Sequence, residues 1–457
     1  MEDGTGASTS PSEPAPRHRG TVLASDWPAA VAAAAGTFVV PLLLGEAAGF
    51  LVSVVSRPPR PEALTFARLG ALLFYTFNHV GVTAELSRLA AIPGTPGSLP
   101  GPVVAGLSIT PMAGTFMVAL VMALSCGRAA NTNEVTGVRR VALGVKAGVG
   151  YAALCGVAAL ALRVDVATAQ GSGTLRPDRV QAFVWPLIIG TAAGIIGALG
   201  RGLRDDSRPL GSPRWEWQAR ALVVGGGRLV LLALGLSLVA LAALAPFSPR
   251  ATRAYFEPFS HRPVDGVVRM AFTTLVLPNV SFWALTPSEG GCLGFSLAPV
   301  GGGSLRGCLV SYTQFPPAGG VAGIAAAAPG MDLPPPPAGY LGFLLAPLIA
   351  VIGGGWMAAR RAVARGGRGA EAGALAGVGF GLWSAVAAAL SSVGVSILGT
   401  AADRTELAIR IGPQVLVTAL VALAWGVIGG AVGGAALSRR ARKSSPTSPA
   451  LGGVAER

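Results

Sequence analysis

The amino-acid sequence predicts an all-α, polytopic helical membrane protein with about ten hydrophobic segments. Hydrophobic residues make up 52% of the 457-residue chain, and charged residues only 12%, whereas soluble domains carry about 25% charged residues. The mean hydropathy is +0.60. The chain also holds 65 glycines and 35 prolines, which membrane helices tolerate better than soluble helices do. This composition excludes an ordinary soluble enzyme, a disordered regulator and a coiled coil.

The hydrophobic segments follow from windows of about 20 residues, the length that crosses a bilayer core of about 30 Å. They run over 28–55, 64–84, 102–126, 141–162, 181–200, 221–245, 265–285, 338–358, 372–399 and 413–437. Five membrane helices are therefore expected in 28–200 and five in 221–437, with the basic loop 201–220 between them. The tails 1–27 and 438–457 are rich in Ser, Pro and charged residues, so we expect them to be disordered.

Basic residues predict the orientation of these segments in the membrane. The chain has 35 Lys and Arg against 21 Asp and Glu, a net charge of +14. The basic residues flank the apolar segments. Positive charge is favoured there by the cytoplasmic side of the membrane and by anionic lipids, so we expect these residues to contact the bilayer and not nucleic acid. If all ten segments cross, loop 201–220 lies outside the cytoplasm. If 64–84 and 265–285 enter and return on the outer side, eight crossings remain, and loop 201–220 and both termini are cytoplasmic. We favour the second topology for a multi-pass plasma-membrane protein and keep the first as the alternative.

The two segments expected not to cross are both interrupted by polar residues. Segment 64–84 contains Asn78–His79, and segment 265–285 contains a break at Pro278–Asn279. Each is followed by a Gly/Pro-rich stretch, which in the second half is the apolar outer loop 286–337. The two halves thus share an order of segments, which favours a five-plus-five repeat of the kind found in transporters. The alternative is that any ten-helix chain can be divided into two fives.

A candidate intramembrane polar site consists of the charged or polar residues within these segments, Glu46, Arg68, His79, Arg228 and Asn279. A charge at the centre of a membrane helix costs about 2.5–3.5 kcal/mol on insertion scales. We therefore expect Glu46 to pair with Arg68 or Arg228. Such a group can serve as a substrate or proton site, or it can simply fix helix register. A titrating His79 could relay protons, or it could only end its helix.

Glycines recur every four residues in the last two segments. The ladders are Gly373, Gly377 and Gly381 in one segment and Gly426, Gly430 and Gly434 in the next. This spacing places glycines on one helix face, where another backbone can approach closely. The partner is a neighbouring helix of the same bundle or a second copy in a homodimer.

The four cysteines are Cys126, Cys155, Cys292 and Cys308. Cys292 and Cys308 lie in the outer loop 286–337, where an oxidising compartment would permit a disulfide between them; the alternative is two unpaired thiols.

The sequence lacks Cys-x-x-Cys pairs, a Cys/His cluster, and the common metalloprotease, serine-hydrolase and P-loop motifs. We therefore predict no metal, no cofactor and no enzyme activity.

Four stretches carry a resemblance to a known family. They are GLSITPM at Gly106–Met112, LVLPN at Leu275–Asn279, SSVGVSILG at Ser391–Gly399 and LAWGVIGGAVGG at Leu423–Gly434. In this order they resemble the streptophobe family, hydrophobic multi-pass proteins of Streptomyces and relatives. A looser similarity is to the PerM-like actinobacterial cell-division membrane proteins. The resemblance implies an actinobacterial plasma-membrane protein without a known reaction or ligand. We expect it to act through membrane or cell-envelope protein partners; the alternative is a secondary transporter or channel with its site at the interrupted helices.

Overall fold

The structure is a computed structural model whose helices and strands form two similar halves. It describes residues 26–56, 63–86, 103–132, 138–168, 171–202, 218, 221–244, 263–298, 305–310, 344–364, 367–399 and 406–444. The statements below concern these residues.

Helices make up most of the described chain. They are α1 (Trp27–Ser56), α2 (Ala63–Phe77), α3 (Met112–Thr132), α4 (Val138–Ala161), α5 (Gln181–Gly202), the π-helical turn η2 (Ala221–Gly225) continuing into α7 (Gly226–Leu244), α9 (Pro263–Ser288), α11 (Leu345–Ala364), α12 (Gly369–Ser391) and α13 (Val415–Ser444). Seven helical stretches are long and apolar enough to cross a membrane: Trp27–Leu51, Met112–Thr132, Val138–Ala161, Gln181–Gly200, Ala221–Ala243, Gly369–Ser391 and Val415–Ala441. These seven apolar helices among the described residues support the predicted polytopic helical membrane protein.

An eight-stranded antiparallel sheet corrects the all-α prediction. Its strands are β1 (Val82–Leu86), β2 (Val103–Ser108), β3 (Val164–Thr168), β4 (Gly171–Pro177), β5 (Leu293–Ala298), β6 (Leu305–Val310), β7 (Val393–Gly399) and β8 (Glu406–Pro413). They lie in the order β3-β4-β1-β2-β7-β8-β5-β6. These strands have only 5–8 residues and directly adjoin apolar helices. A 20-residue window merges them with the helices, so the predicted segment 372–399 in fact contains α12 and β7.

Two further expectations about the second half are corrected. The predicted break at Pro278–Asn279 is absent, since α9 continues as a helix from Pro263 to Ser288. A proline within a membrane helix is tolerated where neighbouring elements compensate for its missing donor. The stretch 286–337, expected to be an outer loop, contains β5 and β6.

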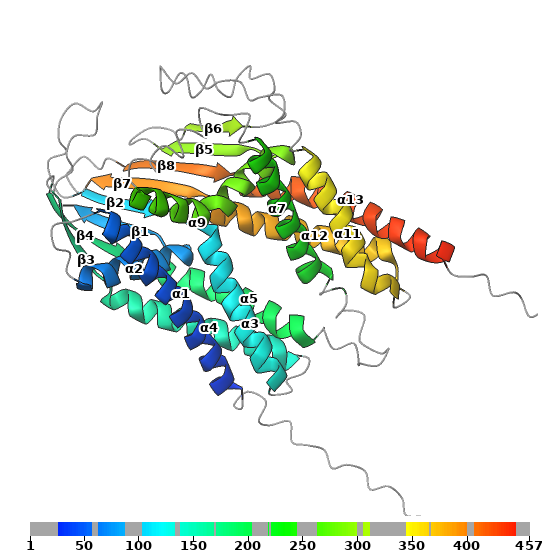
Figure 1. Ribbon diagram of the computed structural model, residues 1–457, viewed down its shortest axis with the longest axis horizontal. Coiled ribbons are helices and arrows are strands. Elements are labelled where there is room, and N and C mark those ends of the chain that lie inside the picture. Colours follow the sequence, from blue (N-terminus) through cyan, green and yellow to red (C-terminus); the bar gives the residue numbers. More distant parts are fainter. Residues whose placement is uncertain are drawn as a thin grey trace, which may run out of the picture.

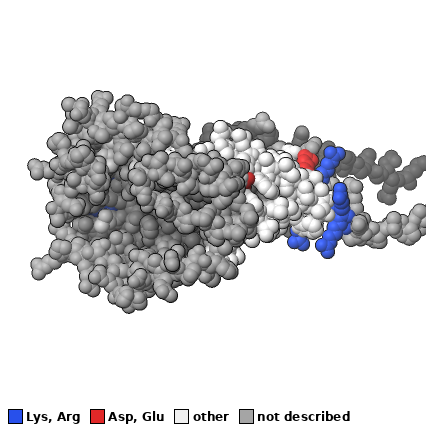
Figure 2. All heavy atoms as spheres, turned by 90° about the horizontal axis from the view of Figure 1, so that it is seen from above, with Lys and Arg blue, Asp and Glu red and all other residues white. Residues whose placement is uncertain are grey.

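The sheet lies at one end of the helix bundle. In Figure 1 the helices extend away from it toward the lower right, and each strand hairpin is inserted between two helices: α2 and α3, α4 and α5, α9 and α11, α12 and α13. In Figure 2 the described Lys and Arg side chains gather at one end of the visible surface, beside a broad surface of other residues. Arg139 and Arg140 at the start of α4, and Arg439 and Arg440 near the end of α13, lie at the helix ends distant from the hairpins.

Both halves use the same order of elements and the same strand order. The first half gives β3-β4-β1-β2 and the second β7-β8-β5-β6, so β1 corresponds to β5 and β3 to β7. Helix packing corresponds as well. In the first half α1 packs on α3 and α4, and both α3 and α4 pack on α5. In the second half α7 packs on α11 and α12, and both of these pack on α13. Each half has its own apolar core.

The glycine ladders hold α12 and α13 in backbone contact. A Cβ added to Gly377 would lie 2.0 Å from the carbonyl oxygen of Gly426, and one added to Gly373 would lie 2.0 Å from that of Gly430. The corresponding helices α4 and α5 meet in the same way, with Gly148 against Thr191 and Gly144 against Ile195. These contacts are within one chain, so the ladders contribute to bundle packing.

Candidate functional site at the sheet–helix junction

Two of the helices that lead into the sheet, α2 and α9, end in the same backbone cap. At the end of α2, the amides of Val80 and His79 donate to the carbonyls of Tyr75 and Thr76. At the end of α9, the amides of Gly291 and Gly290 donate to the carbonyls of Thr286 and Pro287. This is the pattern of a Schellman cap, whose penultimate residue is left-handed. His79 has φ 60° and Gly290 has φ 95°, so the residues before them, Asn78 and Glu289, occupy equivalent positions.

In the first half, the polar groups at this position are paired. The Asn78 side chain is fully buried. Its Nδ2 donates to the carbonyl oxygen of Phe74 at 3.0 Å, and its Oδ1 accepts from the Tyr151 hydroxyl at 2.6 Å. The Tyr75 hydroxyl donates to the carbonyl oxygen of Cys155 at 2.7 Å. The first-half cap is therefore a closed hydrogen-bonded cluster between α2 and α4.

His79 is the left-handed residue of this cap, and the charge of Arg410, on β8 of the second half, acts on it. Its Nδ1 is hydrogen-bonded with the Thr110 hydroxyl, and its ring packs edge-on against Trp185 with centroids 4.3 Å apart. Burial, together with the charge of Arg410, lowers the pKa of the His79 imidazole from 6.5 to about 4. The imidazole is therefore neutral at neutral pH. A left-handed conformation is strained for a residue other than glycine, and these contacts hold His79 in it.

Asn279 and His79 both form a hydrogen bond with Thr110. The Nδ2 of Asn279 donates to the carbonyl oxygen of Thr110 at 2.7 Å, and its Oδ1 accepts from the backbone amide of Met112 at 2.9 Å. Met112 is the first residue of α3, whose first amides have no partner within the helix. Asn279, on α9 of the second half, thus caps a helix of the first half. Two of the five predicted polar-site residues are brought together, and they join the halves.

The other three predicted residues lie apart from this junction. Glu46 lies against α2, where a Cβ on Gly70 would be 2.7 Å from its Oε2. The charge of Arg68 acts on Asp165 of β3, and Arg228 is exposed on α7. Two ion pairs between described residues, Arg163–Asp165 and Arg176–Glu85, lie on the sheet. The expected pairing of Glu46 with Arg68 or Arg228 is not among them.

Glu289 is a buried carboxyl at the second-half cap that sequence reasoning assigned to the outer loop. It lies outside the seven candidate spans, is 3% exposed, and neither carboxyl oxygen has a hydrogen-bond partner among the described residues. Burial alone raises the pKa of this carboxyl from 4.5 to about 8. A signal for it exists in the sequence: Glu289 precedes Gly290–Gly291, the glycine pattern that ends helices.

The cysteines divide between the bundle and the sheet. Cys126 and Cys155 are free and buried, whereas Cys292, directly before β5, is disulfide-bonded. Cys308 lies on β6, with its backbone opposite Gly294. The pairing of Cys292 with Cys308 stays a prediction. Thiol labelling of the denatured protein should find two reactive cysteines before reduction and four after it.

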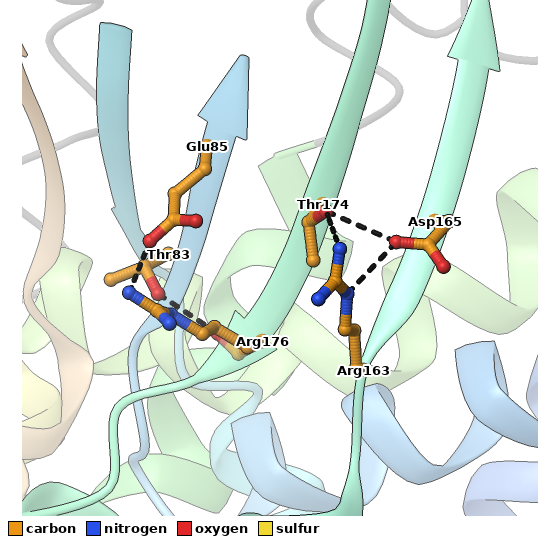
Figure 3. A network of polar contacts seen from close by, with 6 residues as sticks. All are labelled: Thr83, Glu85, Arg163, Asp165, Thr174 and Arg176. Carbon is orange, nitrogen blue, oxygen red and sulfur yellow. Dashed lines mark hydrogen bonds and ion pairs between the residues drawn. The ribbon is translucent and has the colours of Figure 1, made fainter. Parts of the chain in front are cut away.

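The sheet has two chemically different faces. Figure 3 shows the polar face in the first half, where Arg176 pairs with Glu85, and Arg163 contacts Asp165 and Thr174 at 3.0 and 3.3 Å. On the opposite face, Leu107, Val395 and Ile409 lie side by side across β2, β7 and β8, because Leu107 pairs with Val395 and Val395 with Ile409. They are 45%, 38% and 38% exposed. We call these three residues the apolar stripe.

The described residues contain no group of His, Cys, Asp or Glu able to hold a metal ion. Comparison with known proteins finds no matching family model, no matching curated protein and no matching solved structure. The chemistry of the junction and of the sheet therefore has to be interpreted from the chain itself.

Proposed function

We propose that this protein is an integral plasma-membrane scaffold that presents its sheet outside the cytoplasm and acts by binding a cell-envelope protein there. The observation that carries the proposal is the apolar stripe, an exposed row of three aliphatic side chains across the middle of the sheet. Exposed apolar patches on folded proteins mark interaction surfaces. Opposite to it lies a charged and hydroxyl-rich face, which gives the sheet two distinct binding surfaces.

The proposed orientation rests on charge. The described basic clusters near the ends of α4 and α13 lie away from the sheet, and positive charge favours the cytoplasmic side. With the sheet outside, the seven candidate spans in α1, α3, α4, α5, α7, α12 and α13 cross, and α11 is proposed as an eighth crossing. Because α2 and α9 do not cross in this arrangement, both termini are cytoplasmic. The disulfide-bonded Cys292 at the sheet is consistent with an oxidising outer compartment.

The proposed evolutionary unit is one half of the chain. The shared strand order and helix packing support a parallel tandem repeat. The resemblance to the streptophobe family, and the actinobacterial envelope that it implies, belong to this same proposal. The proposal also includes protein partners in the membrane or cell envelope. It further includes contacts between the basic helix ends and anionic lipid.

In-cell photo-crosslinking tests the scaffold. A photoreactive residue at Val395 should give a discrete protein adduct, and one at Leu382 of α12, which is 56% exposed, should label lipid only. Ile409→Asp on the same stripe should abolish the Val395 adduct without lowering the amount of protein in the membrane. Absence of a protein adduct at Val395, or an adduct indifferent to Ile409→Asp, would refute the proposal.

A secondary transporter is the second candidate, and the orphan carboxyl of Glu289 favours it. Transporters place ion sites at the ends of helices that do not cross the membrane fully, and α9 ends at Ser288, directly before Glu289. Ion-gradient-driven uptake by purified protein in liposomes, lost in Glu289→Gln, would favour this candidate over the scaffold.

A further inference from the structure

The Glu289 carboxyl is the least satisfied polar group at the junction. Both of its oxygens are buried without a hydrogen-bond partner among the described residues. Native proteins pair the great majority of their buried polar atoms, so each exception requires a physical explanation. A buried charge without a partner is costly enough that the group normally takes its neutral form.

The first half shows what is missing. Tyr151, which donates to Asn78, lies thirteen residues before Val164, the first residue of β3. The residue thirteen places before Val393, the first residue of β7, is Phe380, which carries no hydroxyl. The second half therefore combines an ionisable Glu with an apolar Phe where the first combines Asn with Tyr. The backbone caps match, whereas the second half has no hydroxyl at the position that corresponds to Tyr151.

Two further buried hydroxyls of the second half have no hydrogen-bond partner among the described residues. Ser384, one turn after Phe380 on α12, and Thr418, in the first turns of α13, both have buried hydroxyl oxygens without a hydrogen bond among the described residues. α13 lies directly on the cap: Trp425 Nε1 donates to the carbonyl oxygen of Glu289 at 2.8 Å, and a Cβ on Gly290 would be 3.9 Å from Val421 Cγ1. Thr418 is three residues before Val421, and so lies on the same helix face.

Among the described residues, no cationic side chain forms an ion pair with the Glu289 carboxyl. Burial is the one cause that raises the pKa of the Glu289 carboxyl. No charged group of the described elements packed on it contributes to this shift. Phe282, Leu285 and Phe380, around the end of α9 and on α12, are all fully buried. Such a close-packed apolar environment favours a ligand that carries positive charge and needs almost no space.

We propose that Glu289 is a proton-binding site at the outer end of the second half, where α13 covers the cap of α9. A proton from the outer aqueous phase binds one carboxylate oxygen and forms a single O–H bond, and release restores the carboxylate. The proposed proton-binding site is compatible with both a scaffold and a transporter. It requires only that the junction open far enough for a proton to exchange.

The first test is the pH dependence of unfolding of the full-length protein in detergent. At Glu289 the folded state binds more protons than the unfolded state between pH 4.5 and about 8, so the contribution of this carboxyl to the unfolding free energy falls as pH rises through this window and levels off above it. Glu289→Gln should remove this decline. Glu85→Gln, at the half-exposed ion pair of β1, is the control and should keep it. A decline unchanged in Glu289→Gln would overturn the proposal.

The second test does not require a variant to fold. A hydrophobic carbodiimide reacts with protonated carboxyls in apolar surroundings, so native wild-type protein should be labelled at Glu289 near neutral pH. Labelling, located by peptide mass spectrometry, should fall about tenfold for each pH unit above the pKa, because protonation of a single site follows this dependence. Labelling that does not vary with pH, or none at Glu289, would overturn the proposal. Protection by Na⁺ at constant pH would overturn its specificity for the proton.

Discussion

The ends of α2 and α9 share one backbone geometry and differ in chemistry. Both close with the same pair of hydrogen bonds and a left-handed residue. In the first half, Asn78 and Tyr151 form a closed hydrogen-bonded pair, whereas in the second half neither carboxyl oxygen of Glu289 has a hydrogen-bond partner among the described residues. The comparison shows that one cap geometry can hold a structural polar cluster at one helix end and an ionisable, unsatisfied group at another. The first-half cap thereby serves as an internal reference for the second-half cap.

The largest expected effect concerns the helix seam that supports the second-half junction. Gly377→Ala would place a Cβ 2.0 Å from the Gly426 carbonyl oxygen. Backbone atoms cannot rotate away, so we expect a loss of about 3 kcal/mol, the upper end of the usual cost of overpacking. Thermal unfolding in detergent measures it. Gly353→Ala, where nothing lies within 4 Å, is the matched control and should be neutral or slightly stabilising. Equal melting temperatures for the two variants would contradict the seam.

The next effect breaks the first-half cluster. Tyr151→Phe removes the donor to Asn78 Oδ1 and leaves a buried acceptor unpaired, which should cost about 2 kcal/mol. The variant makes the first half resemble the second. Asn78→Leu combined with Tyr151→Phe should recover part of the loss, because no buried polar group then remains. If Tyr151→Phe alone leaves the melting temperature unchanged, the cluster does not stabilise the fold.

The two halves should respond to pH in opposite directions. The His79 pKa is about 4 in the folded protein and 6.5 in the unfolded chain, so the unfolded state binds more protons between these values. In a Glu289→Gln background, where the opposing contribution of Glu289 is removed, stability should therefore fall as the medium is acidified, by about 1 kcal/mol between pH 6.5 and 5.5. His79→Asn, which also tolerates the left-handed conformation, should remove this acid sensitivity and, where Glu289 is retained, leave the decline toward alkaline pH that Glu289 causes. An unchanged acid limb in His79→Asn would show that another group is responsible.

The smallest expected effect comes from making the second half resemble the first. Phe380→Tyr supplies a hydroxyl where Tyr151 stands in the first half, so it should donate to the Glu289 carboxylate, stabilise the fold by about 1 kcal/mol above pH 8 and lower the pKa of Glu289. The alkaline midpoint of the unfolding curve reports the pKa change. Phe282→Tyr, at a fully buried phenylalanine near the end of α9, is the control and should destabilise without moving the midpoint. A midpoint unmoved in Phe380→Tyr would break the correspondence between the halves.

Much of this protein follows from local sequence properties. Hydropathy identified the membrane helices, and arginine density marked the helix ends now found away from the sheet. The four-residue glycine spacing indicated a close helix contact, and Asn279 and His79 stood out as polar residues in apolar segments. Each of these signals belongs to one segment and to its immediate preference for lipid, water or a flat helix face, so it can be detected without knowing what the segment packs against.

The sheet, the partner helix of each glycine ladder and the state of Glu289 were decided only by tertiary structure. β2 pairs with β7, nearly three hundred residues later in the chain, and the short strands carry no period that a hydropathy window can separate from the adjoining helices. Glu289 was assigned to an outer loop because its neighbours in sequence are Ser, Pro and Gly. It is buried because α13 covers the end of α9. Burial and strand pairing are set by contacts between distant segments, and the desolvation that gives Glu289 its chemistry exists only once those segments have packed.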